Sequence, residues 1–231
     1  MTLLLLIRHG ENDIMHRRLA GHRPGVHLNE KGRGQAQALT QALAHAPIAA
    51  VYSSPLERAL ETAAPLAETR GLQVEIRPAL IDTNYGDWQW RTYKQLRRIK
   101  LWKTVLESPT QMRFPNGETI AEVQTRVIND LTALASLHQV EPGEEKEKKE
   151  EIIIAAVAHA DVVRLALTHY LNMALDDFHR LVVFPASISM VHLPREGRPL
   201  VVHINQVAGY AWPEKSDPQT KGRKRKQVKN G

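Results

Sequence analysis

Residues 3–11 read Leu3-Leu4-Leu5-Leu6-Ile7-Arg8-His9-Gly10-Glu11, and this stretch decides the fold. A short, unbroken apolar run is typical of a strand buried on both faces, as in a parallel sheet. The run ends abruptly, which places a cation, an imidazole and a flexible backbone at the carboxyl end of the strand. Open α/β sheets bind their ligands at that end. The stretch therefore predicts an α/β fold with a functional site around His9.

A second apolar strand is also followed by a histidine. Residues 152–158 are entirely apolar, His159-Ala160-Asp161 comes next, and an apolar helix is expected over residues 162–171. A lone His9 could simply close its strand. Two buried strands that each end in a histidine would, if they are neighbours, bring both imidazoles to one spot.

A helix start follows the strand predicted over residues 49–52. In Ser53-Ser54-Pro55-Leu56-Glu57-Arg58-Ala59, Ser54 suits an N-cap, Pro55 suits the first helical position, and Glu57 would complete a capping box. The positive end of this helix would face the site around His9. Arg58 in the first turn could bind an anion through two hydrogen bonds, or it could be an ordinary surface arginine.

The remaining pattern alternates strands and helices. Strands are expected over residues 73–76, 187–193 and 200–205, and helices over 29–45, 92–106 and 119–138. Asn29 would cap the first of these helices, Thr119 and Glu122 would form a capping box on the last, and Trp102 and Leu106 would face inward on the middle one. We predict a three-layer α/β/α sandwich with a mostly parallel central sheet. Residues 1–210 would form one domain, in which residues 141–151 would be an exposed loop or an extended helix end with no function assigned.

Composition excludes several classes of protein. The 231 residues include no cysteine, which removes disulfides, thiolate metal sites and cysteine nucleophiles. No apolar run approaches the ~20 residues of a membrane helix, and no basic residue precedes the first run, which makes it a poor signal peptide. We expect a cytoplasmic protein that has no membrane contact.

The formal net charge of +6 belongs to the end of the chain. Six basic residues and no acid lie within 221–231, and the rest of the chain holds 25 of each sign. Residues 211–231 are therefore predicted to be a disordered basic tail. Contact with nucleic acid is not expected except through this tail.

Two loops carry polar side chains that could form a site. Residues 11–28 form a long loop without periodicity, and such loops are usually functional. Its histidines lack carboxylates at metal-ligand spacing, so no metal is predicted. In the irregular segment over residues 80–88, Asp82 and Asp87 are the candidate proton donors.

The ordered series of motifs resembles the histidine phosphatase superfamily, in its phosphoglycerate-mutase-like branch. The resemblance extends over residues 3–206 and rests on Arg8-His9-Gly10-Glu11, Leu28-Asn29-Glu30-Lys31-Gly32 with Gln35-Ala36, Ser53-Ser54-Pro55-Leu56-Glu57-Arg58-Ala59 with Glu61-Thr62-Ala63, Tyr85-Gly86-Asp87-Trp88, Phe114-Pro115-Asn116-Gly117-Glu118, Ala158-His159, Ala160-Asp161-Val162-Val163-Arg164 and Phe184-Pro185-Ala186-Ser187-Ile188-Ser189.

The resemblance implies a role for each matching residue. His9 would attack phosphorus and carry the phosphoryl group, with a backbone carbonyl holding its other ring N–H. Arg8, Arg58 and His159 would hold the phosphoryl oxygens, and Asp82 would be the proton donor, with Asp87 as the fallback. No metal and no cofactor would take part. The candidate substrate-binding residues are Asn12, Arg18, Gly21, His22 and Ala160.

Three positions depart from the family pattern. Asp82 stands where the family more often has the longer Glu. Met15 stands where it usually has Asn, and either Asn12 or His16 could replace the lost phosphate contact. Ala160 stands where Gly commonly follows the second histidine.

The expected function is a metal-independent phosphomonoester hydrolase that acts through phosphohistidine on a small phosphorylated metabolite. The alternatives are a cofactor-dependent phosphomutase of the phosphoglycerate mutase type and a non-catalytic module that binds phosphorylated ligands or RNA. A mutase of this family usually has a longer insertion after the Gly-x-Trp loop, so the short interval from Trp88 to Phe114 favours hydrolysis. The basic residues of this interval suggest an acidic substrate or a solvated helix face; they are Arg91, Lys94, Arg97, Arg98, Lys100 and Lys103.

Overall fold

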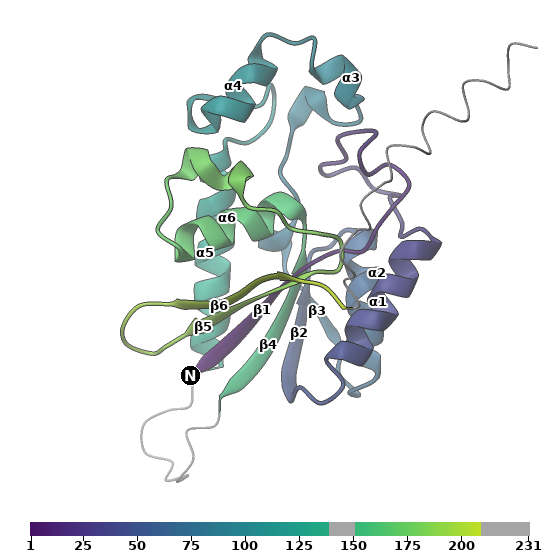
Figure 1. Ribbon diagram of the computed structural model, residues 1–231, viewed down its shortest axis with the longest axis vertical. Coiled ribbons are helices and arrows are strands. Elements are labelled where there is room, and N and C mark those ends of the chain that lie inside the picture. Colours follow the sequence, from purple (N-terminus) through teal and green to yellow (C-terminus); the bar gives the residue numbers. More distant parts are fainter. Residues whose placement is uncertain (139–150, 209–231) are drawn as a thin grey trace, which may run out of the picture.

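The computed structural model describes residues 1–138 and 151–208, which are built around a six-stranded sheet (Figure 1). The strand order is β3-β2-β4-β1-β5-β6. The first four strands of this order are parallel, and β5 and β6 are antiparallel to their neighbours. The strands are β1 (Thr2–Arg8), β2 (Ile48–Ser53), β3 (Val74–Ile76), β4 (Ile152–Ala158), β5 (Ile188–Leu193) and β6 (Leu200–Gln206). The predicted, mostly parallel sheet is confirmed.

Helices cover both faces of the sheet. Alternate residues of β1 enter two separate cores, because Leu3 and Leu5 pack with α1 and α2 whereas Leu4 and Leu6 pack with α5 and α6. Two short helices, α3 and α4, lie beyond the carboxyl ends of the parallel strands (Figure 1). The helices are α1 (Glu30–Ala42), α2 (Glu57–Glu68), α3 (Tyr93–Leu96), α4 (Leu101–Glu107), α5 (Ile120–Leu137) and α6 (Ala160–Tyr170), with 3-10 turns η1 (Pro78–Leu80), η2 (Gly86–Trp88), η3 (Pro109–Gln111) and η4 (Leu175–Arg180). The three-layer α/β/α architecture is confirmed.

The register between β1 and β4 aligns the two histidines. Arg8 pairs with Ala158, the last residue of each strand. The His9 backbone N–H continues the pairing and donates to Ala158 O at 2.9 Å. His9 and His159 therefore leave the sheet side by side, as their positions in the sequence suggested.

Two of the three predicted helix caps are confirmed. The Asn29 side chain accepts from Gly32 N at the start of α1, and Thr119 with Glu122 forms the capping box of α5. The third is wrong, because α2 begins at Glu57 and its N-cap Leu56 makes no side-chain cap bond. The Ser54 hydroxyl bonds with the His159 ring at 2.7 Å and also accepts from Leu56 N at 3.4 Å, just before the helix begins.

The helix predicted over residues 92–106 is also wrong as a single element. It is divided into α3 and α4 by a turn over residues 97–100. Leu106 is 50% exposed, and the neighbouring Val105 fills the core in its place. The inward face of α4 is therefore displaced by one residue from the predicted one, and Trp102 is only partly buried.

Two predicted segments lie outside the described residues. These are the basic tail over 211–231 and, except for its last residue, the connection over 141–151. Within the described residues, no helix combines the length and the apolar character needed to cross a membrane.

A close backbone contact joins α1 to the loop after His9, and it predicts different outcomes for two glycines of the same helix. A Cβ on Gly32 would lie 2.0 Å from Glu11 O, whereas a Cβ on Gly34 would meet nothing within 4 Å. We expect Gly32→Ala to lower the free energy of unfolding in urea by about 1–3 kcal/mol, since the packed backbones must separate. Gly34→Ala should raise it by about 0.5–1 kcal/mol through helix propensity. Equal effects of the two substitutions would contradict the proposed contact.

Candidate active site

His9 presents one ring nitrogen to a cavity at the carboxyl edge of the sheet. Its Nδ1–H donates to Gly10 O at 2.7 Å, as the sequence suggested, so Nε2 carries the free lone pair. Burial lowers the pKa of His9 well below its ordinary value, and the charges of Arg58 and Arg8 lower it further. The imidazole is therefore neutral and suited to act as a nucleophile.

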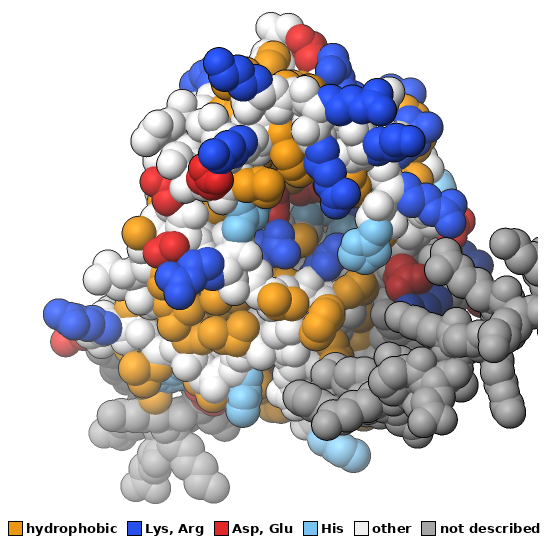
Figure 2. Space-filling view, turned by 45° about the horizontal axis from the view of Figure 1, so that its top comes forward, with side chains coloured by type: hydrophobic (Ala, Val, Ile, Leu, Met, Phe, Trp, Pro, Cys, Tyr) orange, Lys and Arg blue, Asp and Glu red, His pale blue; other side chains and the backbone are white. Residues whose placement is uncertain are grey.

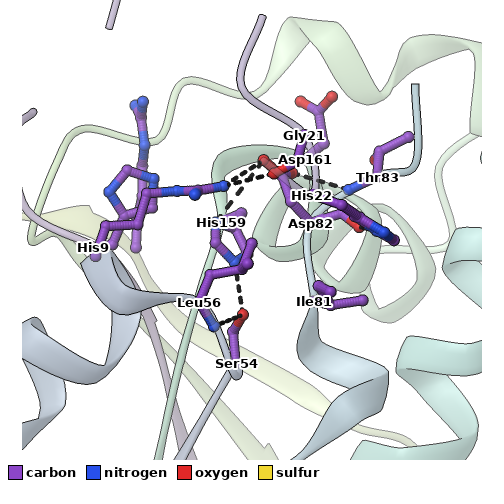
Figure 3. Close-up of polar contacts among 12 residues, drawn as sticks. His9, Gly21, His22, Ser54, Leu56, Ile81, Asp82, Thr83, His159 and Asp161 are labelled. Atoms are coloured by element: carbon purple, nitrogen blue, oxygen red, sulfur yellow. Dashed lines mark hydrogen bonds and ion pairs between the residues drawn. The ribbon is translucent and has the colours of Figure 1, made fainter. Parts of the chain in front are cut away.

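His159 lies beside His9 at the start of α6. The two ring centroids are 5.2 Å apart. Its Nε2 bonds with Ser54 Oγ at 2.7 Å, and its buried Nδ1 has no hydrogen-bond partner among the described residues. Burial and the nearby Arg58 lower the pKa of His159 as well. Figure 3 shows the ring between Ser54 and Asp82.

Two arginines supply further hydrogen-bond donors at the cavity. Arg58 is 1% exposed, and its Nη2 donates to Gly21 O at 2.9 Å and to Asp82 Oδ2 at 3.1 Å. Its Nη1 and the Nε of Arg8 are buried and have no partner within residues 1–138 and 151–208. Both arginines line the same cavity as His9, and the His159 ring lies directly beside His9. Because buried donors are nearly always satisfied, the two arginine nitrogens and the neighbouring Nδ1 of His159 indicate the position of a bound anion.

Asp82 lies at the same cavity, opposite His9. Its Oδ2 is 3.8 Å from His159 Nδ1, and its Oδ1 accepts from Thr83 N at 2.9 Å. Burial raises the pKa of Asp82, and the nearby Asp161 adds to this rise while Arg58 opposes it. A carboxyl group with a raised pKa can hold a proton for transfer.

The alternative acid does not lie at the site. Asp87 is exposed, and its Oδ2 accepts from Asn116 at 3.0 Å. It is not among the residues that line the cavity.

A partly buried arginine fixes the segment that carries Asp82, and sequence reasoning missed it. Arg126 of α5 donates to the carbonyls of Ala79 at 2.6 Å, Ile81 at 2.9 Å and Asp82 at 2.8 Å. Glu118 accepts from the same guanidinium at 2.8 Å and 3.1 Å. The Arg126 guanidinium thus binds three carbonyl oxygens of this segment and fixes the position of Asp82. The helical pattern of α5 marks Arg126 only as a polar position, so no sequence signal identifies this contact.

The predicted substrate-binding residues divide into two groups. Asn12, Arg18 and Ala160 line the cavity. Gly21 and His22 do not, since Gly21 O accepts from Arg58 and His22 Nε2 bonds with Asp82 O at 2.6 Å. Gly21 therefore positions Arg58, and His22 positions the backbone of Asp82.

Met15 also lies at the cavity, where its sulfur accepts from Arg8 Nη2 at 3.4 Å. Both residues suggested as replacements, Asn12 and His16, line the cavity too. Asn12 Oδ1 accepts from Met15 N at 2.9 Å. Its amide oxygen is therefore committed to the backbone.

A largely buried polar cluster lines the cavity near Arg8 and Asp82, and the sequence assigned it no role. Asp161 accepts from Tyr85 OH at 2.7 Å and from Arg164 Nη1 at 3.0 Å. The guanidinium of Arg164 lowers the pKa of Asp161. Asp161 is therefore charged and satisfied. Its spacing of three residues from Arg164 on one helix was the available signal.

A family comparison agrees with the geometry. The model of the histidine phosphatase superfamily (branch 1) matches residues 4–206. The chain belongs to this superfamily. Membership and its relatives named as phosphatases support a phosphatase activity. Within the described residues, no group of three or more His, Cys, Asp or Glu side chains is arranged to hold a metal ion.

Individual relatives show how far the similarity extends. Phosphoserine phosphatase 1 of Hydrogenobacter thermophilus is 26% identical over 213 residues, which cover 89% of this chain and 92% of that protein. A structure of the mycobacterial glucosyl-3-phosphoglycerate phosphatase with inorganic phosphate matches with a TM-score of 0.76 and 25% identity, covering 90% of this chain and 99% of that one. The bifunctional protein Rv2228c of Mycobacterium tuberculosis is 30% identical over 90% of this chain, but the chain spans only 55% of its length.

The unpaired donors predict that inorganic phosphate stabilises the protein. Phosphate at a hundred times its Kd should raise the free energy of unfolding by about 2.7 kcal/mol. Arg58→Met should remove most of this increase, because it deletes a buried donor of the anion site. Arg97→Met is the matched control, since Arg97 is exposed and does not line the cavity. Phosphate-dependent thermal unfolding measures both, and full stabilisation in Arg58→Met would contradict the placement of the anion.

Proposed function

We propose that the protein is a metal-independent phosphomonoester phosphatase that acts through a phosphohistidine at His9 on a small phosphorylated metabolite. The observation that carries the proposal is the neutral imidazole of His9 beside three buried nitrogen atoms of Arg8, Arg58 and His159 that have no partner in the described part of the chain. Such a ring of donors would stabilise the charge on a transferring phosphoryl group.

In the first step, His9 Nε2 attacks phosphorus. The N–P bond forms as the bond from phosphorus to the ester oxygen breaks. Asp82 gives its proton to that oxygen, and the alcohol leaves. His159 contributes an N–H from Nδ1 to a phosphoryl oxygen, in the tautomer where its Nε2 accepts from the Ser54 hydroxyl.

In the second step, Asp82 is a carboxylate and takes a proton from water. The water oxygen attacks phosphorus, the N–P bond breaks, and inorganic phosphate forms. His9 returns to its neutral state with its Nδ1–H still bonded to Gly10 O. The same carboxyl group thus serves as acid and then as base.

Hydrolysis of p-nitrophenyl phosphate in excess chelator tests the proposal. Wild-type activity should survive the chelator, and His9→Ala should lower kcat/KM by about a thousandfold or more, as loss of a nucleophile does. His45→Ala is the matched control, because His45 is exposed and lies outside the cavity. Equal activity of wild type and His9→Ala would reject His9 as the nucleophile. Inactivity of both would favour the phosphomutase or the binding module.

The two pKa shifts predict a pH profile with its optimum on the acidic side of neutrality. Because the pKa of His9 is lowered, kcat/KM should fall only when the pH drops below the ordinary range of histidine. Because the pKa of Asp82 is raised, the proton donor persists to a higher pH than usual, and kcat/KM falls as the pH rises through that value.

Asp82→Asn separates proton donation from phosphoryl transfer. We expect kcat/KM to fall by about 10²–10⁴ for an alkyl phosphate, whose alcohol leaves only with a proton. The loss should be much smaller for p-nitrophenyl phosphate, since p-nitrophenolate leaves unprotonated. The falling limb at higher pH should disappear in the variant. Equal losses for both esters would show that Asp82 is not the donor.

A further inference from the structure

The cavity extends well beyond the side chains that would bind the phosphate. It has a volume of about 310 Å³, and three of the candidate phosphate-binding side chains, Arg8, His9 and Arg58, line it. Side chains of the helices α3 and α4 form another wall of the cavity. An alcohol attached to the phosphate must lie against this wall, so its chemistry decides which esters fit.

The wall is apolar and accessible. It consists of Tyr93 from α3 and of Trp102, Val105 and Leu106 from α4. Trp102 is held by two neighbouring rings, with centroids 6.2 Å away at Tyr93 and 6.1 Å away at Trp88. Leu106 remains 50% exposed in spite of its size. Figure 2 shows apolar side chains at this hollow.

Other polar side chains that line the cavity bond to groups of the protein itself; these are Arg164, Arg18 and His179. Arg164 donates from Nη1 to Asp161 and from Nε to Leu181 O at 2.9 Å. Arg18 lies 5.4 Å from the centroid of the Trp90 ring and donates to Trp90 O. Burial lowers the pKa of His179, which keeps it neutral. Among the described residues, Asp161 therefore balances the charge of Arg164, whereas Arg18 has no carboxylate partner and keeps its charge.

The basic residues between Trp88 and Phe114 add no positive charge to the lining of the cavity. All six are exposed and none lines the cavity; they are Arg91, Lys94, Arg97, Arg98, Lys100 and Lys103. Their positions match the solvated face that the sequence left open. Lys and Arg accordingly lie around the hollow in Figure 2.

We infer that the alcohol part of the substrate carries an apolar body, aliphatic or aromatic, that packs against Tyr93, Trp102 and Leu106. The inference rests on the proposed phosphatase activity and specifies its substrate class. It disfavours compact hydrophilic esters such as O-phosphoserine. Each methylene that leaves water for the wall should improve kcat/KM by about two- to fourfold.

A homologous series of primary alkyl phosphates tests the inference at nearly constant leaving-group reactivity. The series is ethyl, butyl, hexyl and 2-phenylethyl phosphate, with glycerol 1-phosphate and O-phosphoserine as hydrophilic counterparts of butyl phosphate. We expect kcat/KM to rise by at least tenfold from ethyl to hexyl phosphate. Butyl phosphate should exceed both hydrophilic esters.

Variants of one helix connect the preference to the wall. Leu106→Ser and Trp102→Ala should flatten the increase with chain length. Leu101→Ser is the matched control and should keep the wild-type series, because Leu101 is on the same helix, is 48% exposed and does not line the cavity. A series unchanged in Leu106→Ser and Trp102→Ala would overturn the assignment of the wall.

The outcomes separate this inference from the proposed function. If all esters are hydrolysed equally, or the hydrophilic esters are preferred, and His9→Ala abolishes the activity, the phosphatase stands and the apolar substrate is rejected. If neither these esters nor p-nitrophenyl phosphate are hydrolysed, the proposed function fails and the substrate inference fails with it.

Discussion

The burial of the Arg58 guanidinium is the constraint on which the site depends. A charge that leaves water loses several kcal/mol of solvation, which only close partners can offset. Asp82 and the carbonyl of Gly21 satisfy one nitrogen of Arg58, and Nη1 stays without a partner among the described residues. Burial lowers the pKa of both histidines, and the charge of Arg58 lowers it further, so the group that attracts anions also helps to keep the imidazoles neutral.

The fold supplies this arrangement through backbone pairing rather than through flexible side chains. The parallel register of β1 and β4 delivers His9 and His159 to adjacent places, and α2 brings Arg58 to them from the end of β2. Arg126 fixes the segment of Asp82 through three carbonyls. Because strands and backbone carbonyls move little, the reacting groups are oriented before a substrate binds.

The sequence predicted what depends on local pattern. Apolar runs identified β1 and β4, and the residues after them identified both histidines. It failed where a distant partner decides. Ser54 has the chemistry of an N-cap, yet its hydroxyl bonds with His159, which lies 105 positions away in the chain. Leu106 fits a helical core pattern, yet its side chain lines the cavity and is half exposed, because this side of α4 faces the cavity and not the core. The choice between Asp82 and Asp87 likewise required the folded chain.

The most direct test of the account is to trap the covalent intermediate. Asp82→Asn is mixed with p-nitrophenyl phosphate, quenched in alkali, where phosphohistidine persists, and analysed by intact and peptide mass spectrometry. The variant should still take up the phosphoryl group, since this leaving group needs no proton, but should lose it slowly because water is not activated. The account predicts one added phosphoryl group on the peptide that contains His9. This group should be labile in acid, and it should be absent from the double variant that also carries His9→Ala. No adduct, or an adduct on another residue, in an active enzyme would contradict it.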